Sequence, residues 1–276
     1  MKLNKNFFKE NIKTIIYALL IAVFIRSIFF QPFYIPSSSM EPNLLVGDRL
    51  FVSKYTYGYS KHSFPFSPNL FKGRFFFKEP KRGDVVVFKT PTDNRTDYIK
   101  RLIGLPGDII QFIDGDLYLN ENQILKTKIK KNDQIYCGST ILETNTFEEK
   151  LPNGTKYKAV YFKKNSFQNS NKFIVPEDHY FFLGDNRDNS TDSRYLATGP
   201  GYVKKANLVG KARIIFFSTD KKKGNIFQIW KWLEIIHLHQ ETKMMIFLNK
   251  CLKMMLKKFV KLDFKAAQKP KFVNLK

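Results

Sequence analysis

Short apolar runs separated by turn-forming residues fill the chain from residue 32 to about residue 220. Asp84–Lys89 (DVVVFK) and Tyr180–Leu183 (YFFL) are examples, and Gly, Pro, Asn and Asp stand between such runs. β-Branched and aromatic residues in short runs favour strands, and the residues between them favour turns. Because long helical periodicity is absent here, the sequence predicts a mainly β fold with an antiparallel, barrel-like sheet.

One part of this region is more polar than the rest. Between residues 111 and 175 the chain contains runs such as Lys126–Asp133 (KTKIKKND) and none of the dense motifs found on either side. We therefore predict an inserted β lobe at about residues 111–175, within a main domain that spans residues 32–220.

The N-terminal segment carries an apolar run from Thr14 to Phe30 that only Arg26 interrupts, and four lysines precede it. Such a run approaches the length of about 20 residues needed to cross a bilayer. Residues 1–31 are predicted to hold one transmembrane helix with a cytoplasmic N-terminus. A cleaved signal peptide is the alternative, but bulky residues follow Phe30 where a cleavage site needs small ones.

The formal net charge of +23 is unevenly distributed. Residues 221–276 hold fourteen lysines and three acidic residues, so a net charge of +11 lies in this tail. Clustered basic residues often bind nucleic acid, but the rest of the chain is only moderately basic, and no nucleic-acid partner is expected. The excess of Lys, Asn, Ile and Phe is equally well explained by genome composition.

The basic tail has two interpretations that stay open. Within Leu248–Leu262, lysines and apolar residues each recur at spacings of three and four. This pattern is typical of a basic amphipathic helix that lies on an anionic bilayer. A disordered extension is the second interpretation.

Pro36–Pro42 (PSSSMEP) is a turn bracketed by prolines that presents three hydroxyls. A nucleophilic serine needs a base. A Ser-His-Asp arrangement has little support, because none of the four histidines stands in a motif: His62, His179, His237 and His239. The two cysteines, Cys137 and Cys251, are far apart without metal-like spacing, so no disulfide, metal or cofactor is predicted.

Lys100 is a second candidate base, within Asp97–Asp108 (DYIKRLIGLPGD), where apolar residues surround it. Burial disfavours the charged form of a lysine and can lower its pKa by up to about 3–5 units. A neutral amine can then accept a proton from a serine. The alternative is a solvated surface lysine, of which this chain has many.

Three further blocks decide between these alternatives: Gly184–Arg194 (GDNRDNSTDSR), Gly47–Lys54 (GDRLFVSK) and Arg82–Asp84 (RGD). With the Ser-Met turn, they occur in the order found in bacterial type I signal peptidases, which the chain resembles from about Ile25 to Thr219. The resemblance implies a membrane-bound serine endopeptidase that removes N-terminal signal peptides from exported preproteins after Ala-X-Ala-like sequences. It also implies a catalytic domain on the periplasmic side of the inner membrane.

The resemblance also implies roles for single residues. Ser39 would be the nucleophile, Lys100 its general base, and Ser190 a hydroxyl that orients the lysine amine. Ser37 would join the Ser39 backbone N–H in an oxyanion hole. Asp192 and Arg194 would form an ion pair that supports the Ser190 loop, with a solvated charge run as the alternative.

Apolar residues that match the family's two shallow substrate pockets make up a further group. Ordinary core packing is an alternative for them, and both descriptions can hold at once. The family implies that a preprotein binds as an extended strand against a sheet edge. The group comprises Phe33, Ile35, Met40, Leu50, Val87, Tyr98 and Ile99.

The chain departs from the family pattern in places. Ser38 stands where many relatives have Gly, Glu41 is a charged neighbour of the turn, and only one N-terminal span is visible where relatives often have two. Two other functions conflict with the sequence. A self-cleaving protein like the LexA-like repressors conflicts with the anchor and with the missing DNA-binding module. A membrane-tethered binding protein with an inactive site conflicts with the presence of Ser39, Lys100 and Ser190.

Overall fold

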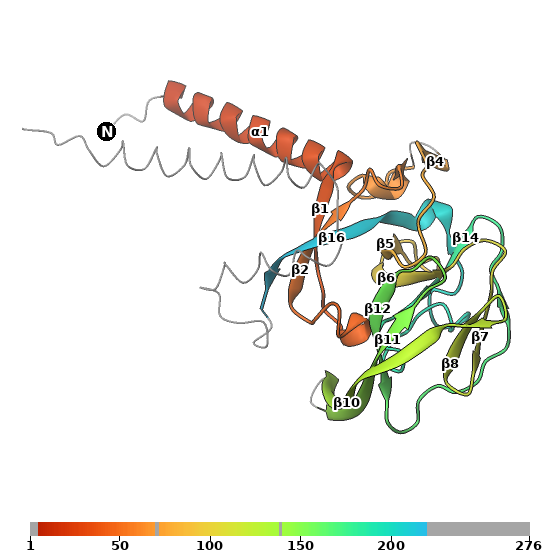
Figure 1. Cartoon of the computed structure of the whole chain (residues 1–276). Coiled ribbons are helices and arrows are strands. Elements are labelled where there is room, and N and C mark those ends of the chain that lie inside the picture. Colours follow the sequence, from red (N-terminus) through yellow and green to blue (C-terminus); the bar gives the residue numbers. More distant parts are fainter. Residues whose placement is uncertain (1–4, 70–71, 138–139, 220–276) are drawn as a thin grey trace, which may run out of the picture. The chain divides into compact units, whose positions relative to one another are not determined.

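Strands dominate the computed structural model (Figure 1), which describes residues 5–69, 72–137 and 140–219. The prediction of a mainly β fold is confirmed. Three short 3₁₀ turns interrupt the strands: η1 (Ser38–Met40), η2 (Lys61–Ser63) and η3 (Lys205–Asn207).

The largest sheet has seven strands, and every pair of neighbours in it is antiparallel. Register shifts along β16 and between β14 and β6 mark irregularities that increase local twist, and the sheet is curled. Its strand order is β1 (Phe30–Tyr34), β2 (Asp48–Ser53), β16 (Leu208–Ser218), β5 (Val85–Lys89), β6 (Asp97–Gly104), β14 (His179–Leu183) and β15 (Val203–Lys204).

Three smaller antiparallel sheets complete the described part of the chain. The three-stranded sheet has the order β10 (Leu125–Cys137), β11 (Thr140–Lys150) and β12 (Lys156–Phe162). A four-stranded sheet has the order β13 (Phe173–Ile174), β7 (Ile109–Ile113), β8 (Asp116–Leu119) and β9 (Asn122–Gln123). A two-stranded sheet joins β3 (Tyr59–Ser60) to β4 (Arg74–Phe75).

Strand β5 explains why this chain contains continuous apolar runs rather than alternating ones. Successive side chains of a strand point to opposite faces of the sheet. Val86 and Phe88 belong to one buried cluster with Leu102 and Phe182, whereas Val87 belongs to another. Both faces of the sheet are therefore covered at this strand, and successive positions from Val85 to Phe88 favour apolar residues.

The N-terminal apolar run forms the helix α1 (Lys5–Ile28). Every residue from 12 to 26 is exposed, so within the described residues nothing covers the apolar side chains of this helix. The predicted membrane span is not confirmed: of the helices in residues 5–219, none is both long and apolar enough to cross a bilayer. Lys13 and Arg26 leave only twelve uncharged residues between them. The amphipathic helix predicted within 248–262 lies outside the described residues.

Candidate active site

Ser39 lies in η1, on the connection between β1 and β2. The turn is closed by hydrogen bonds from Glu41 N to Ser38 O (3.0 Å) and from Asn43 N to Met40 O (3.1 Å). Met40 is completely buried and anchors the turn in the core beneath it. The Pro-bracketed sequence therefore holds the Ser39 hydroxyl at a defined place, largely but not fully covered.

The Lys100 side chain reaches Ser39. Its Nζ donates a hydrogen bond to Ser39 Oγ at 2.5 Å, although 61 residues separate the two in sequence. Lys100 is 5% exposed and lies near the Tyr98 ring, with Nζ 5.5 Å from its centre. Burial lowers the pKa of Lys100 to about 8, against the opposing charges of Asp192 and Asp185. With this pKa, about a tenth of the amine is unprotonated at pH 7 and about half at pH 8.

Two more of the predicted serines lie at the same place. Ser37 Oγ is 3.3 Å from Ser39 Oγ. Ser190 is buried, and its hydroxyl has no hydrogen-bond partner among the residues described. The expected hydrogen bond between Ser190 and the Lys100 amine is therefore not present, and Lys100 donates to Ser39 instead.

Asp192 and Arg194 form a bidentate ion pair. Arg194 Nε donates to Asp192 Oδ1 at 2.8 Å, and Nη2 donates to Oδ2 at 2.9 Å. The same carboxylate accepts a hydrogen bond from Gly184 N at 3.0 Å. Arg194 also donates to the carbonyl of Arg187. The pair therefore closes the loop from Gly184 to Arg194 upon itself, on either side of Ser190.

Three asparagines, which the sequence analysis did not single out, hold the serine turn. Asn186 donates from its backbone N to Ser39 O at 3.1 Å and from Nδ2 to Ser38 O at 3.2 Å. Asn189 Nδ2 donates to Ser38 Oγ at 2.7 Å. Both asparagines belong to the Gly-Asp-Asn-Arg-Asp-Asn-Ser block, so this motif could have indicated them from the sequence. Asn43 belongs to no such motif, so the sequence did not indicate a role for it.

Asp185 joins three parts of the site. Its carboxylate accepts two hydrogen bonds from Arg101, each of 2.7 Å, and a third of 2.7 Å from Asn43 Nδ2. Asn43 also donates to the carbonyl of Lys158 in β12. Arg101 follows Lys100 in β6, so this carboxylate connects the strand of the candidate base, the turn of the candidate nucleophile and the Gly184 loop.

The predicted pocket residues divide into two groups. Ile35, Met40, Leu50 and Val87 are at most 2% exposed and form a core cluster, against which Phe33 and Ile99 pack. Phe33, Tyr98 and Ile99 are only partly buried, and Tyr98 packs against a different cluster. Within this predicted group, these three supply the accessible apolar surface, and the four buried residues lie in the core.

Gly184 allows this close packing. A Cβ atom at this position would lie 2.1 Å from Ser190 Oγ and 2.6 Å from the carbonyl oxygen of Ser39. Both distances are far below van der Waals contact, and the second involves main chain that cannot rotate away. The absence of a side chain lets the Gly184 loop lie directly against the turn of Ser39.

Neither histidine in the described residues contacts Ser39. His62 is buried, with Nδ1 3.1 Å from Ser67 Oγ, and burial lowers its pKa to about 4. His179 Nδ1 is 2.7 Å from the carbonyl of Glu177. His237 and His239 lie outside the described residues.

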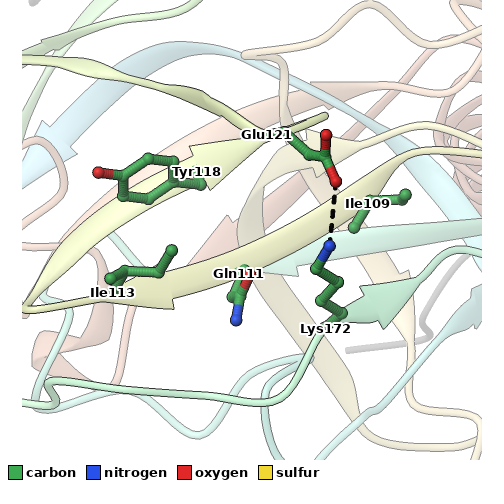
Figure 2. A pocket seen from close by; sticks show the side chains of 6 residues that line it. All are labelled: Ile109, Gln111, Ile113, Tyr118, Glu121 and Lys172. Atoms are coloured by element: carbon green, nitrogen blue, oxygen red, sulfur yellow. Dashed lines mark hydrogen bonds and ion pairs between the residues drawn. The ribbon is translucent and has the colours of Figure 1, made fainter.

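A surface hollow of about 220 Å³ lies away from the candidate residues. Figure 2 shows its lining on β7 and β8, with Lys172 directed at Glu121 across it. That ion pair is 3.0 Å long and exposed. The remaining lining residues are Ile109, Gln111, Ile113 and Tyr118. The two charged side chains of this lining are paired with each other, and none of the residues predicted for the site belongs to it.

Comparison with known proteins gives consistent matches. A family model described as "Signal peptidase, peptidase S26" matches residues 8–217. Signal peptidase I of Rickettsia typhi is 42% identical over 253 residues, which cover 85% of this chain and 93% of that protein. Signal peptidase I of Rickettsia prowazekii is 40% identical over 252 residues, covering 85% of this chain and 93% of that protein.

One solved structure among the matches is a signal peptidase I from Enterococcus faecalis V583. It is 27% identical, with a TM-score of 0.28, and the match covers 49% of this chain and 97% of that chain. The family model spans more than half of the chain, and the rickettsial proteins match most of it. The chain therefore belongs to the signal peptidase I family, peptidase S26, and is a serine peptidase that hydrolyses peptide bonds.

Proposed function

We propose that this enzyme removes N-terminal signal peptides from exported preproteins, with Ser39 as nucleophile and Lys100 as general base. The observation that carries the proposal is the 2.5 Å hydrogen bond from Lys100 Nζ to Ser39 Oγ. The base is buried, and its pKa of about 8 suits proton transfer near neutral pH.

The proposed reaction follows the usual course of acyl transfer. Neutral Lys100 takes the proton of Ser39 as Oγ attacks the scissile carbonyl, and the Lys100 ammonium then protonates the departing amine. This leaves an ester between Ser39 and the signal peptide. A water molecule, deprotonated by Lys100, attacks that ester, and the Ser39 hydroxyl is restored.

Two hydroxyls have supporting parts in this proposal. Ser37 Oγ and the backbone N–H of Ser39 stabilise the negative oxygen of the tetrahedral intermediate, since Ser37 Oγ is 3.3 Å from Ser39 Oγ. Ser190 orients the Lys100 amine while the amine lone pair accepts the proton of Ser39. The unsatisfied, buried Ser190 hydroxyl supports this role, because such a group gains a partner when the lysine turns toward it.

The preprotein is proposed to bind as an added strand along β6. Strand β14 pairs with β6 only at Arg101, Leu102 and Gly104. Along Asp97–Lys100, β5 is the only partner strand in the described part of the chain. The free side of this segment can accept the backbone of an extended peptide beside the dyad. Small side chains of that peptide would lie against Phe33, Tyr98 and Ile99.

The helix α1 is proposed to hold the enzyme in the bacterial cytoplasmic membrane, with the N-terminus inside and the catalytic part on the exported side. Its apolar side chains are exposed on all sides, as lipid contact requires. At 24 residues it is about 36 Å long, and anchoring by this helix would require Lys13 and Arg26 to extend toward the two interfaces. Release of the full chain from membranes by alkaline carbonate would refute this anchoring.

Within this proposal the domain boundaries remain those expected from the sequence. The anchor occupies residues 1–31, the peptidase domain residues 32–220 with the insert at about 111–175, and the basic extension residues 221–276.

The dyad is tested by substitution. Ser39→Ala and Lys100→Met should each reduce cleavage of a purified preprotein by about three orders of magnitude or more, because nucleophile and base act as a unit. Lys100→Arg should be equally inactive, since guanidinium stays protonated. N-terminal sequencing of the wild-type product identifies the bond cut, and circular dichroism confirms that the variants fold. Substantial turnover by Ser39→Ala or Lys100→Met would refute the assignment of these two residues as the catalytic dyad.

The pH dependence identifies the base. Lys100 accepts a proton only when neutral, so kcat/KM should fall about tenfold per pH unit below its pKa of about 8. Replacing all four histidines with Gln should leave this acidic limb in place, since the pKa of His62 is lowered to about 4. Loss of the limb in that variant would assign the base to a histidine.

Substrate specificity tests the pocket. In peptides that differ only at the residue before the cut, Ala should be cleaved at least about tenfold faster than Phe, since a shallow pocket excludes a large ring. Ile99→Ala should narrow this ratio by enlarging the pocket. Ile113→Ala is the control, because Ile113 lies on β7 and is exposed. Equal rates for Ala and Phe with the wild type would refute the pocket assignment.

A further inference from the structure

A buried polar cluster beneath the site takes no part in the proposed reaction. Glu149 of β11 and Arg187 of the Gly184 loop are each 1% exposed in their side chains and form a bidentate pair with two distances of 2.8 Å. The hydroxyls of Tyr157 and Tyr161 donate to the Glu149 carboxylate at 2.6 and 2.5 Å. Strands β11 and β12 of the three-stranded sheet thus supply all hydrogen-bond partners of the Arg187 guanidinium group except the carbonyl of Gly184.

The cluster is completely satisfied. Arg187 has five N–H donors: two meet Glu149, one meets Tyr161 Oη at 2.8 Å and one meets Tyr157 Oη at 2.9 Å. The last, on Nε, meets the carbonyl of Gly184 at 3.2 Å. Burial alone would raise the pKa of Glu149, but the Arg187 charge and these hydrogen bonds hold it below its usual value. A buried, fully bonded ion pair allows one arrangement of its parts.

The cluster is directly connected to the site through main chain. Arg187 N donates to Val160 O at 2.9 Å, and Val160 N donates to Asp185 O at 2.8 Å. The loop therefore pairs with β12 along its backbone, while its Arg187 side chain is held by Glu149 of β11 and by two tyrosines of β12. The residue between these two pairing points, Asn186, donates to the carbonyl of Ser39. Displacement of Arg187 would therefore move the groups that hold the serine turn.

We propose that Glu149 is a positioning residue: through Arg187 it fixes the Gly184–Arg194 loop against the three-stranded sheet and so holds Ser39 and Lys100 in register. The inference rests on the proposed dyad. Glu149 contacts neither Ser39 nor Lys100, and its burial keeps it from substrate. The three-stranded sheet thereby becomes a working part of the active site.

The test compares Glu149→Gln with the wild type in the full-length enzyme. The amide preserves volume but removes the charge and turns a donor toward Arg187. We expect kcat to fall about 10- to 100-fold with little change in KM, because small misplacement of reacting groups has effects of this size. We also expect the acidic limb of kcat/KM to move to higher pH, since a loosened loop admits water to Lys100 and relieves its desolvation.

The position of the acidic limb depends on the environment of Lys100, and therefore on the titratable and charged groups that face its amine. They come from η1, from β6 itself and from the loop after β14, and are Ser39, Tyr98, Asp185, Asp192 and Arg194. None of them is altered in Glu149→Gln, so a moved limb reflects their displacement. A limb that stays in place, while activity falls by the same factor as the folded fraction at every pH, would reduce Glu149 to a purely structural role and overturn the proposal.

Glu148→Gln is the matched control, because Glu148 precedes Glu149 on β11 but is exposed and pairs with Lys156 at 3.0 Å. It should leave kcat and the limb unchanged. If Glu149→Gln does not fold, Tyr161→Phe replaces it: the ion pair remains, one hydrogen bond to each partner is lost, and the same shifts should appear at smaller size. Their absence in a folded Tyr161→Phe enzyme would count against the proposal.

Ser39→Ala in the same assay separates two kinds of failure. Residual cleavage by Ser39→Ala would refute the dyad itself. An inactive Ser39→Ala together with an unaffected Glu149→Gln would refute only the positioning role.

Discussion

The carboxylate of Asp185 is the point on which the geometry of the site depends. It is fully buried and accepts hydrogen bonds from Arg101, next to the candidate base, and from Asn43, just beyond the candidate nucleophile. A carboxylate can receive several donors at once, so one side chain brings together segments separated by up to 142 residues. The hydrogen bond between Lys100 and Ser39 depends on this junction, because the segments that carry the two residues are both bonded to Asp185.

Two buried ion pairs act on the amine through Asp185, Asp192 and Arg194, namely Arg101 with Asp185 and Arg194 with Asp192, and a third buried pair, Arg187 with Glu149, lies beneath the site. Removing one member of such a pair leaves an uncompensated charge, which costs about 3–5 kcal/mol, a large part of a typical folding free energy of about 5–15 kcal/mol. The pairing also matters for chemistry. Asp192 alone would favour the protonated form of Lys100, and Arg194 opposes that effect. An arginine that never touches the amine thus helps to keep it neutral.

The sequence predicted the mainly β fold, because apolar runs and turn residues are local signals, and the dense motifs identified the segments that meet at Ser39. The partners of those segments were not predictable in the same way. Glu148 and Glu149 form one acidic pair in the sequence, and nothing local indicates that the first is exposed and the second buried. Only the register of β11 against its neighbours separates them. Asn43 likewise acquires its importance from Lys158 and Asp185, which lie more than 100 residues away.

Glycine is required for two different reasons in this chain, and the reason determines which substitutions each position tolerates. At Gly107 the backbone has a φ of +83°, and a Cβ would meet nothing within 4 Å. Only this backbone conformation therefore restricts which residue can occupy the position. Asparagine is tolerated in such a conformation. At Gly184 the restriction is space, because the Ser39 carbonyl and the Ser190 hydroxyl occupy the volume of any side chain. An amino acid without a functional group of its own is therefore less replaceable here than many that carry one.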